Sequence, residues 1–292
     1  MRSAAAISEH LDTRTAAIEV ALMLEQAMSG PIDIVFVFAS FHHREALELA
    51  IADIRRTLAP ITIIGMTTES VVGCDLELEG VAGLSALAMQ LPGISIKTWT
   101  TTPEHPVPIS KPEKIPAWIG LQDDTKAVFI FADPFSTPIT RLLPALVNCR
   151  GEGNLLPVIG GMASGASQAK YNRLFLDGQA IRSGGIGLTL SGPLELDCIV
   201  SQGCRPIGEH YRVTKVDGNV VLELGGKPAL EVLHDLATSV GAKERDFLQG
   251  GLLLGGVIDE NKNYFGRGDF LVRSILGIDK KRKGIAAGEF YR

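Results

Sequence analysis

The sequence has few cysteines and no arrangement that would pair them. Cys74, Cys149, Cys198 and Cys204 are scattered through 292 residues, form no C-x-x-C, and have no histidine at zinc-binding spacing. This usage is typical of a protein with free thiols in a reducing cytosol. We therefore expect a cytoplasmic protein without a metal site.

Aromatic residues, long apolar runs and an excess of basic charge are also missing. Aromatics make up 6% of the chain, which disfavours an aromatic cage or stacking platform. No apolar run reaches the length of a membrane span, and Met1–Glu9 is not followed by the apolar stretch of a signal peptide. A net charge of -5 argues against nucleic acid or an anionic membrane as the main partner. We expect neither nucleic-acid binding nor membrane insertion.

Signatures of common cofactors are absent from the sequence as well. There is no G-x-x-x-x-G-K-[ST] phosphate loop and no G-x-S-x-G nucleophile elbow. Gly184, Gly185 and Gly187 lead into an apolar run, whereas a dinucleotide fingerprint must leave a strand and open a helix. No cofactor is expected.

What the sequence does contain is an internal repeat in a fixed order. Strand-like apolar segments recur at a spacing of roughly 95 residues, which indicates a duplicated unit. Each copy reads strand, helix, strand, loop, strand, strand, so a parallel pair with a right-handed crossover precedes antiparallel strands. The matching segments are Ile34–Ala39 with Ala127–Ala132, Ile61–Gly65 with Leu156–Gly160, Val81–Leu87 with Ser183–Leu190, and Ile94–Thr100 with Leu194–Ser201.

The repeat predicts a mixed α/β (α+β) fold, with two similar units packed as layered mixed sheets. The region between the copies contains five prolines, which favours an extended connector. The texture changes after Gly203, where a smaller domain is expected to begin. The expected parts are an N-terminal helix at 1–31, a duplicated domain at 32–203 with copies at about 32–102 and 127–203, the connector at 103–116, and a smaller, incomplete α+β domain at 204–292.

A stretch with almost no side-chain bulk follows one of the buried strands. Glycines allow the backbone to turn sharply and approach another group closely. Exposed amides and hydroxyls after a strand suit a small polar ligand, although a tight packing turn is the alternative. The candidate ligand-binding residues in this stretch are Gly160, Gly161, Ser164, Gly165 and Ser167.

The equivalent loop of the first copy carries Thr67, Thr68, Glu69 and Ser70. Since ligands of open α/β sheets bind at the carboxyl ends of parallel strands, the two loops are expected to form one site. Their amides and hydroxyls would bind a carboxylate and Glu69 an ammonium, a pairing that suits a zwitterion. Asp133 also follows a strand and is expected either to cap the next segment or to lie at the rim of this site.

Three other features receive structural interpretations. His42 and His43 are adjacent and so point apart, which favours a solvated helix start over a metal site. Cys204 lies in a G-C-R-P-I-G turn with no histidine placed as its base, so a structural role is expected. The basic run Lys280–Lys283 is expected to be a solvated loop.

These motifs together resemble the FIST family (F-box and intracellular signal transduction). The resemblance covers most of residues 32–292, and its I-G-G-x-A-S-G segment and G-x-P-I-G turn are the specific parts. The matching stretches are IVFVFAS, IIGMTTES, GLSAL, VFIFADPFS, VIGGMASGAS, LFLDGQAIRSGGIGLTLSG, VSQGCRPIGE, VTKVDGNVVLELGGKPALEVL and GDFLVRSILGID. The resemblance implies FIST N and FIST C domains, cytoplasmic proteins in bacteria and F-box partners in eukaryotes. Members usually continue beyond the position of Arg292.

The resemblance further implies sensing of small ligands such as amino acids. We therefore expect a sensory signal-transduction protein that binds a small molecule without catalysis and relays the signal to a partner protein. Two alternatives stay open at this point. One is a hydrolase or transferase that uses Ser164 or Cys204 and needs a base within hydrogen-bond reach. The other is a protein–protein adaptor without a ligand.

Overall fold

A computed structural model of the chain describes residues 1–151, 153–198, 204, 206–241, 251–258, 262, 264–266 and 269–288. They form two compact units, Met1–Leu196 and Asp197–Arg292. The first unit contains β1 (Arg2–Ser8), α1 (Thr13–Ala27), β2 (Ile34–Ser40), η1 (Phe41–His43), α2 (Leu47–Leu58), β3 (Thr62–Thr68), β4 (Ser70–Gly73), β5 (Leu76–Glu79), β6 (Leu84–Gln90), β7 (Ser95–Thr101), η2 (Pro112–Lys114), α3 (Ile115–Ile119), β8 (Thr125–Ala132), α4 (Ile139–Val147), β9 (Val158–Met162), β10 (Leu174–Leu176), β11 (Gln179–Ile181) and β12 (Gly185–Ser191).

The first unit is built from two sheets that repeat one strand order. One sheet runs β1-β6-β2-β3-β10-β11 and the other runs β7-β12-β8-β9. In each sheet a parallel pair, β2–β3 or β8–β9, lies beside antiparallel strands. The prediction of a mixed α/β fold made of duplicated units is therefore confirmed.

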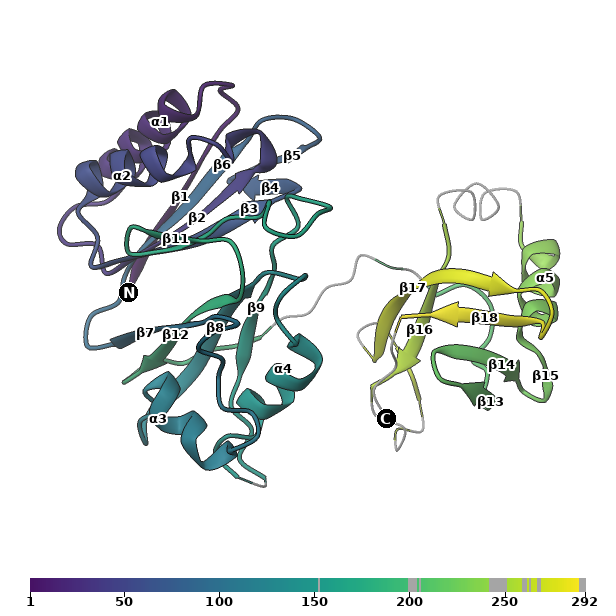
Figure 1. Ribbon diagram of the computed structural model, residues 1–292. Coiled ribbons are helices and arrows are strands. Elements are labelled where there is room, and N and C mark those ends of the chain that lie inside the picture. Colours follow the sequence, from purple (N-terminus) through teal and green to yellow (C-terminus); the bar gives the residue numbers. More distant parts are fainter. Residues whose placement is uncertain are drawn as a thin grey trace. The chain divides into compact units, whose positions relative to one another are not determined.

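The two sheets lie between two helical layers (Figure 1). Along β2, Val35 and Val37 pack against α1 and α2, whereas Ile34 and Phe36 pack against the second sheet. This alternation follows from the two-residue period of a strand. On the far face of the second sheet, Ile130 packs under α3 and α4. The result is a four-layer α/β/β/α arrangement, with a separate apolar core between each pair of layers.

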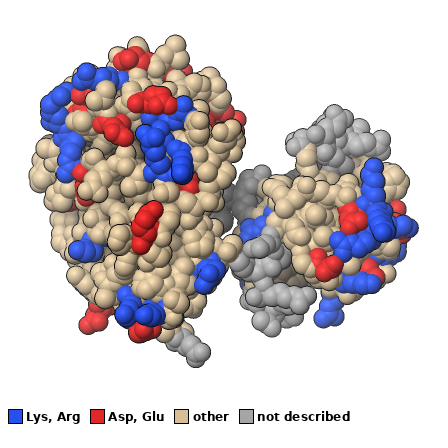
Figure 2. All heavy atoms as spheres, viewed as in Figure 1, with Lys and Arg blue, Asp and Glu red and all other residues tan. Residues whose placement is uncertain are grey.

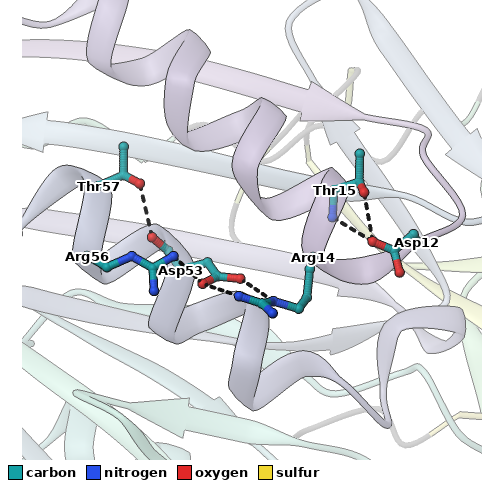
Figure 3. Close-up of polar contacts among 6 residues, drawn as sticks. All are labelled: Asp12, Arg14, Thr15, Asp53, Arg56 and Thr57. Carbon is teal, nitrogen blue, oxygen red and sulfur yellow. Dashed lines mark hydrogen bonds and ion pairs between the residues drawn. The ribbon is translucent and has the colours of Figure 1, made fainter.

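A buried carboxylate fastens the outer helices α1 and α2 together (Figure 3). Asp53 on α2 accepts two hydrogen bonds from Arg14 on α1, at 2.7 and 3.0 Å. Arg56 on α2 donates a further bond of 2.7 Å to the same carboxylate. These contacts hold the pKa of Asp53 below its usual value, chiefly through the hydrogen bond from Arg14.

The repeat boundaries differ from those expected from the sequence. The segment at 1–31 contains β1 as well as the expected helix, and β1 pairs with β6. Strand β7, expected to end the first copy, pairs with β12 and so holds the place in the second sheet that β1 holds in the first. Each copy therefore opens with its own edge strand. The sequence analysis missed β1 because this strand, RSAAAIS, has few of the β-branched and aromatic residues typical of strands.

The proline-rich connector is part of the second copy. Pro112–Lys114 forms η2 and Ile115 opens α3, where Ile115 and Ile119 are fully buried. The position of α3 after β7 corresponds to that of α1 after β1. The strand expected at Leu194–Ser201, at the end of the second copy, is not formed at 194–198. Its remaining residues, 199–201, and the following 202–203 lie outside the described residues.

A hairpin breaks the symmetry between the two copies. Strands β10 and β11, joined by the two-residue turn Asp177–Gly178, extend the first sheet by pairing with β3. Both turn residues have positive φ, 50° and 92°, as a tight hairpin turn requires. The corresponding hairpin of the first copy, β4–β5, instead forms a small sheet of its own. The second copy therefore contributes strands to the sheet of the first.

The second unit is a smaller α+β arrangement. Its described elements are β13 (Val213–Asp217), β14 (Val220–Leu224), β15 (Lys227–Pro228), α5 (Ala229–Ser239), β16 (Leu253–Val257), β17 (Phe270–Asp279) and β18 (Gly284–Ala287). The sheet order is β13-β14-β18-β17-β16. Helix α5 packs on this sheet through Ala229 and Val232.

Charges of both signs are interspersed on the visible face (Figure 2). The basic run at the end of β17 is a turn, as expected, and its charges are partly paired. Arg282 contacts Asp217 and Asp279, both at 2.6 Å, and Lys283 contacts Glu231 at 2.7 Å.

Among the described residues, no helix combines the length and apolar character that crossing a membrane demands.

Candidate functional site

The carboxyl ends of the two parallel strand pairs meet across the sheets. Phe38 near the end of β2 and Phe131 near the end of β8 have ring centroids 5.5 Å apart. Strands β2 and β8 therefore run alongside each other, and the loops that follow β3 and β9 leave from the same edge of the unit. This arrangement sets the two polar loops of the sequence face to face.

The two loops are in direct contact. The backbone N–H of Glu69 donates a hydrogen bond of 3.1 Å to the hydroxyl of Ser164. Gly165 lies so close to the end of β3 that a Cβ at this position would be 3.0 Å from the Cβ of Thr67. The expectation that loops far apart in the sequence come together is confirmed by these two contacts.

Gly160 and Gly161 lie within β9 rather than after it. A Cβ on Gly160 would lie 1.7 Å from the carbonyl oxygen of Ile130, and its φ is +151°. Only glycine allows this approach to β8. Gly160 therefore allows β9 to pack closely on β8. The loop itself starts at Ala163, so Ser164, Gly165 and Ser167 are the candidate residues of this stretch that lie in the loop.

Several predicted ligand-binding hydroxyls already take part in internal hydrogen bonds. Thr67 is fully buried, and its hydroxyl accepts a bond of 2.9 Å from the backbone N–H of Arg173. The hydroxyl of Thr68 donates to the carbonyl of Ala39 at 3.5 Å, and Ser70 opens β4. By contrast, the side chains exposed at the junction come from Glu69, Ser164 and Ser167.

Asp133 is buried in a polar network that ties together two loops. Its carboxylate accepts bonds from the Ser136 hydroxyl at 2.6 Å and the Asn172 amide nitrogen at 3.1 Å. Ser136 in turn accepts a bond of 2.7 Å from the backbone N–H of Gly184. The backbone carbonyl of Asp133 accepts from Thr137 at 3.1 Å, which closes the turn before α4. Asp133 thus joins a turn to the Asn172 segment.

Asn172 and Arg173 occupy the centre of the junction, and sequence reasoning missed both. The amide nitrogen of Asn172 also donates to the carbonyl of Ala163 at 3.2 Å, while its side-chain oxygen has no hydrogen-bond partner within the described residues. The backbone N–H of Arg173 donates to the hydroxyl of Thr67, and the backbone carbonyl of Arg173 accepts from the backbone N–H of Thr67. A sequence signal was available in the Asp177–Gly178 turn, which predicts a hairpin directly after these residues.

His43 is buried, so the expectation of a solvated helix start is wrong for this residue. Its Nδ1 lies 3.0 Å from the hydroxyl of Thr13, and its Nε2 has no hydrogen-bond partner among the described residues. Burial lowers the pKa of His43, and the neighbouring His42 lowers it further. His42 remains exposed, with Nδ1 at 3.3 Å from Ser40.

The described residues at the junction include no side-chain base hydrogen-bonded to Ser164. Within the described ranges, no group of three or more histidine, cysteine, aspartate or glutamate side chains could hold a metal ion. The hydrogen bond at the hydroxyl of Ser164 comes from a backbone amide, not from a side-chain base. Cys204, the other candidate nucleophile, is exposed.

A protein-family model for the FIST N domain matches residues 33–227. The match confirms the resemblance drawn from the strand and loop motifs. It spans the duplicated unit and enters the second unit. The FIST C domain that the resemblance implies for 204–292 stays a prediction.

Relatives with similar sequences occur in mycobacteria and archaea. An uncharacterised protein of Mycobacterium tuberculosis is 32% identical over 295 residues, which cover 99% of this chain and 73% of the relative. One of Mycobacterium bovis is 28% identical over 301 residues, with the same coverage. One of Methanocaldococcus jannaschii is 32% identical over 111 residues, covering 37% of this chain and 20% of the relative.

Proposed function

The chain belongs to the FIST family, whose domain is associated with signal transduction, and on this basis we propose that it is a cytoplasmic sensory protein. It binds a small ligand such as an amino acid at the junction of the two strand-end loops. It does so without catalysis and relays the bound state to a partner protein.

The contact between Glu69 and Ser164 is the observation that carries this proposal. It joins loops that are 95 residues apart in sequence and come from different copies of the repeat. A ligand at this point contacts both copies at once. Binding there can change how the two halves are held together, which is what a sensor needs in order to alter a partner-binding surface.

The exposed groups at the junction suit a zwitterion. The carboxylate of Glu69 offers an acceptor for an ammonium group, and the hydroxyls of Ser164 and Ser167 offer donors for a carboxylate. Both charges of an amino acid would then be met by side chains from opposite loops. Such a ligand replaces the weak contact between the loops with several charge-assisted hydrogen bonds.

The geometry at Ser164 supports binding over the hydrolase or transferase alternative. A serine nucleophile requires a base within hydrogen-bond reach, and Ser164 instead accepts from the amide of Glu69. The close packing of Gly165 on Thr67 is also compatible with the adaptor alternative, which needs no ligand. A ligand screen separates the adaptor from the sensor.

The test is a thermal-shift screen of the purified chain against the standard amino acids. Binding to the folded state alone raises the melting temperature by mass action. A hit is then repeated with Ser164→Leu, and with Ser95→Leu as a matched control at an exposed serine at the start of β7. Loss of the shift in Ser164→Leu alone supports the proposal. No shift with any amino acid contradicts it and favours the adaptor.

A further inference from the structure

The outer edge of β9 pairs with no other strand among the described residues, because β9 lies at the end of the second sheet. The carbonyl of Pro157 and the N–H of Ala163 bond to β8. Since backbone groups alternate in direction along a strand, those of Val158, Gly160 and Met162 point away from β8. Within the described part of the chain, these outward groups form no hydrogen bond. The edge therefore offers donors and acceptors to a further strand.

The equivalent edge of the first sheet already holds such a strand. In the repeat β3 corresponds to β9, and β10 pairs with the outer edge of β3 in the antiparallel sense. Phe175 lies opposite Gly65 in this pair, and the N–H of Thr67 donates to the carbonyl of Arg173 at 2.9 Å. An edge of this kind thus binds an extended segment within the same protein.

Gly65 and Gly160 hold the same position in the two copies, but only Gly65 is covered. A Cβ on either residue would lie 1.7 Å from a carbonyl oxygen of the neighbouring strand. A Cβ on Gly65 would also lie 2.5 Å from the ring of Phe175, and Gly65 is buried. The three atoms nearest to a Cβ on Gly160 are all backbone atoms of Ile130, and Gly160 is exposed. The second copy therefore leaves open the position that an aromatic ring fills in the first.

The sequence of β9 also lacks the features that keep strands from adding to an edge. Natural edge strands are protected by charged side chains, by proline or by short length. In the first unit, β1 contains Arg2, β7 contains Lys97, and β11 has only three residues. Strand β9, VIGGM, contains neither a charge nor a proline. Of these four edges, β9 is the one best suited to accept a strand.

We propose that the outer edge of β9 binds an extended segment of a partner protein as an added antiparallel strand, with an aromatic side chain over Gly160. The backbone of the segment bonds to the outward groups of β9, and its aromatic ring covers Gly160 as Phe175 covers Gly65. A second copy of the chain, paired about a two-fold axis at Gly160, would place glycine opposite glycine and leave this position uncovered. The surface is separate from the loop junction and does not rest on the ligand proposed there.

The probe is a fluorescein-labelled peptide with the sequence of residues 172–178, NRLFLDG, which contains β10. Fluorescence anisotropy with the whole chain is expected to show saturable binding of one peptide per chain. Phe175→Ala in the peptide is expected to weaken binding about tenfold or more, because no ring then covers Gly160. Absence of saturable binding would overturn the proposal.

N-methylation of the peptide tests the strand pairing itself and leaves the protein unchanged. In the register of β10, the N–H of Phe175 faces the neighbouring edge and that of Leu176 faces away from it. An N-methyl group at Phe175 is expected to weaken binding about tenfold or more, whereas one at Leu176 changes it by less than about twofold. Equal losses from the two peptides would contradict pairing with the backbone of β9.

Substitutions in the protein assign the binding to β9. Val158→Lys places a cation on this edge, as Lys97 does on β7, and is expected to weaken binding about tenfold. Val213→Lys is the matched control and should leave binding unchanged, since Val213 is an exposed valine on β13, an edge strand of the second unit. Unaltered binding in Val158→Lys would overturn the proposal. A dimer of the chain that Val158→Lys dissociates would also overturn it, because the edge would then belong to a second copy.

Discussion

The hydroxyl of Ser164 accepts a hydrogen bond of 3.1 Å from the backbone N–H of Glu69, and this bond joins the two halves of a duplicated unit. The partners follow β9 and β3, the second strands of two equivalent parallel pairs. This bond adds a polar contact at the strand ends to the apolar core that packs the two sheets together.

Ser164→Ala is expected to lower the free energy of unfolding by about 1 kcal/mol, the usual value of one neutral hydrogen bond. Ser167→Ala is the matched control, because Ser167 is an exposed serine of the same loop with no hydrogen bond inside the described ranges. Its effect should stay within about 0.5 kcal/mol. Urea unfolding of both variants measures the difference, and equal losses would show that the bond contributes nothing.

Asn172→Asp is expected to destabilise the protein by about 2–4 kcal/mol, because it places a second carboxylate against the buried Asp133. Repulsion raises the pKa of one of the two carboxyl groups above its unfolded value. The native state therefore holds a proton more tightly, and the stability of the variant falls as pH rises through that raised pKa.

The pH dependence of unfolding in denaturant checks this second prediction. The deficit of Asn172→Asp should shrink as pH is lowered towards 4. Asn154→Asp is the control, since Asn154 is exposed and its side chain forms no hydrogen bond within the described ranges. A deficit that is the same at every pH would mean that the carboxylates do not interact.

Asp53→Asn is expected to reduce stability at neutral pH by about 1–3 kcal/mol, because charge-assisted bonds from Arg14 and Arg56 weaken. Those bonds lower the pKa of Asp53 in the folded protein. Its contribution is present above the unfolded pKa and is lost as pH falls through the folded pKa. Unfolding at pH 7 and pH 3 should therefore show a smaller difference at pH 3. Glu48→Gln on the same helix should show no such trend.

His43 is expected to make the protein less stable in mild acid. Burial depresses its folded pKa below the unfolded value of about 6.5. Between these two values the unfolded chain binds more protons, so stability is retained above about pH 6.5 and falls as pH drops below it. Melting temperatures from pH 7.5 to 5 should decline less steeply in His43→Gln. His105→Gln, at an exposed histidine, should follow the parent protein, and identical slopes in all three would contradict this account.

The sequence predicted the duplication and the meeting of the two loops because both depend on local patterns. Segments such as Ile34–Ala39 have the composition of buried strands in any context, and small residues mark the loops. Local patterns could not predict which sheet each edge strand, β1 or β7, joins. Whether β7 pairs with the first or the second sheet depends on packing between layers, which leaves no periodic signal in its own residues.

The hydrophobic pattern of the sequence likewise did not predict which polar side chains are buried. His43, Asp133 and Arg173 all occur in polar stretches that read as exposed loops. All three are buried in the folded unit, and for two of them a residue distant in sequence supplies a hydrogen-bond partner: Thr13 for His43 and Asn172 for Asp133. Such partners become visible only once the layers are assembled.

Hydrogen–deuterium exchange at the loop junction, with and without a mixture of the standard amino acids, tests the central claim most directly. The account predicts slower exchange of the amides at 67–70 and 163–167 when the mixture is present, and no slowing in Ser164→Leu. Unchanged exchange at both loops in the presence of the mixture would contradict binding at this junction.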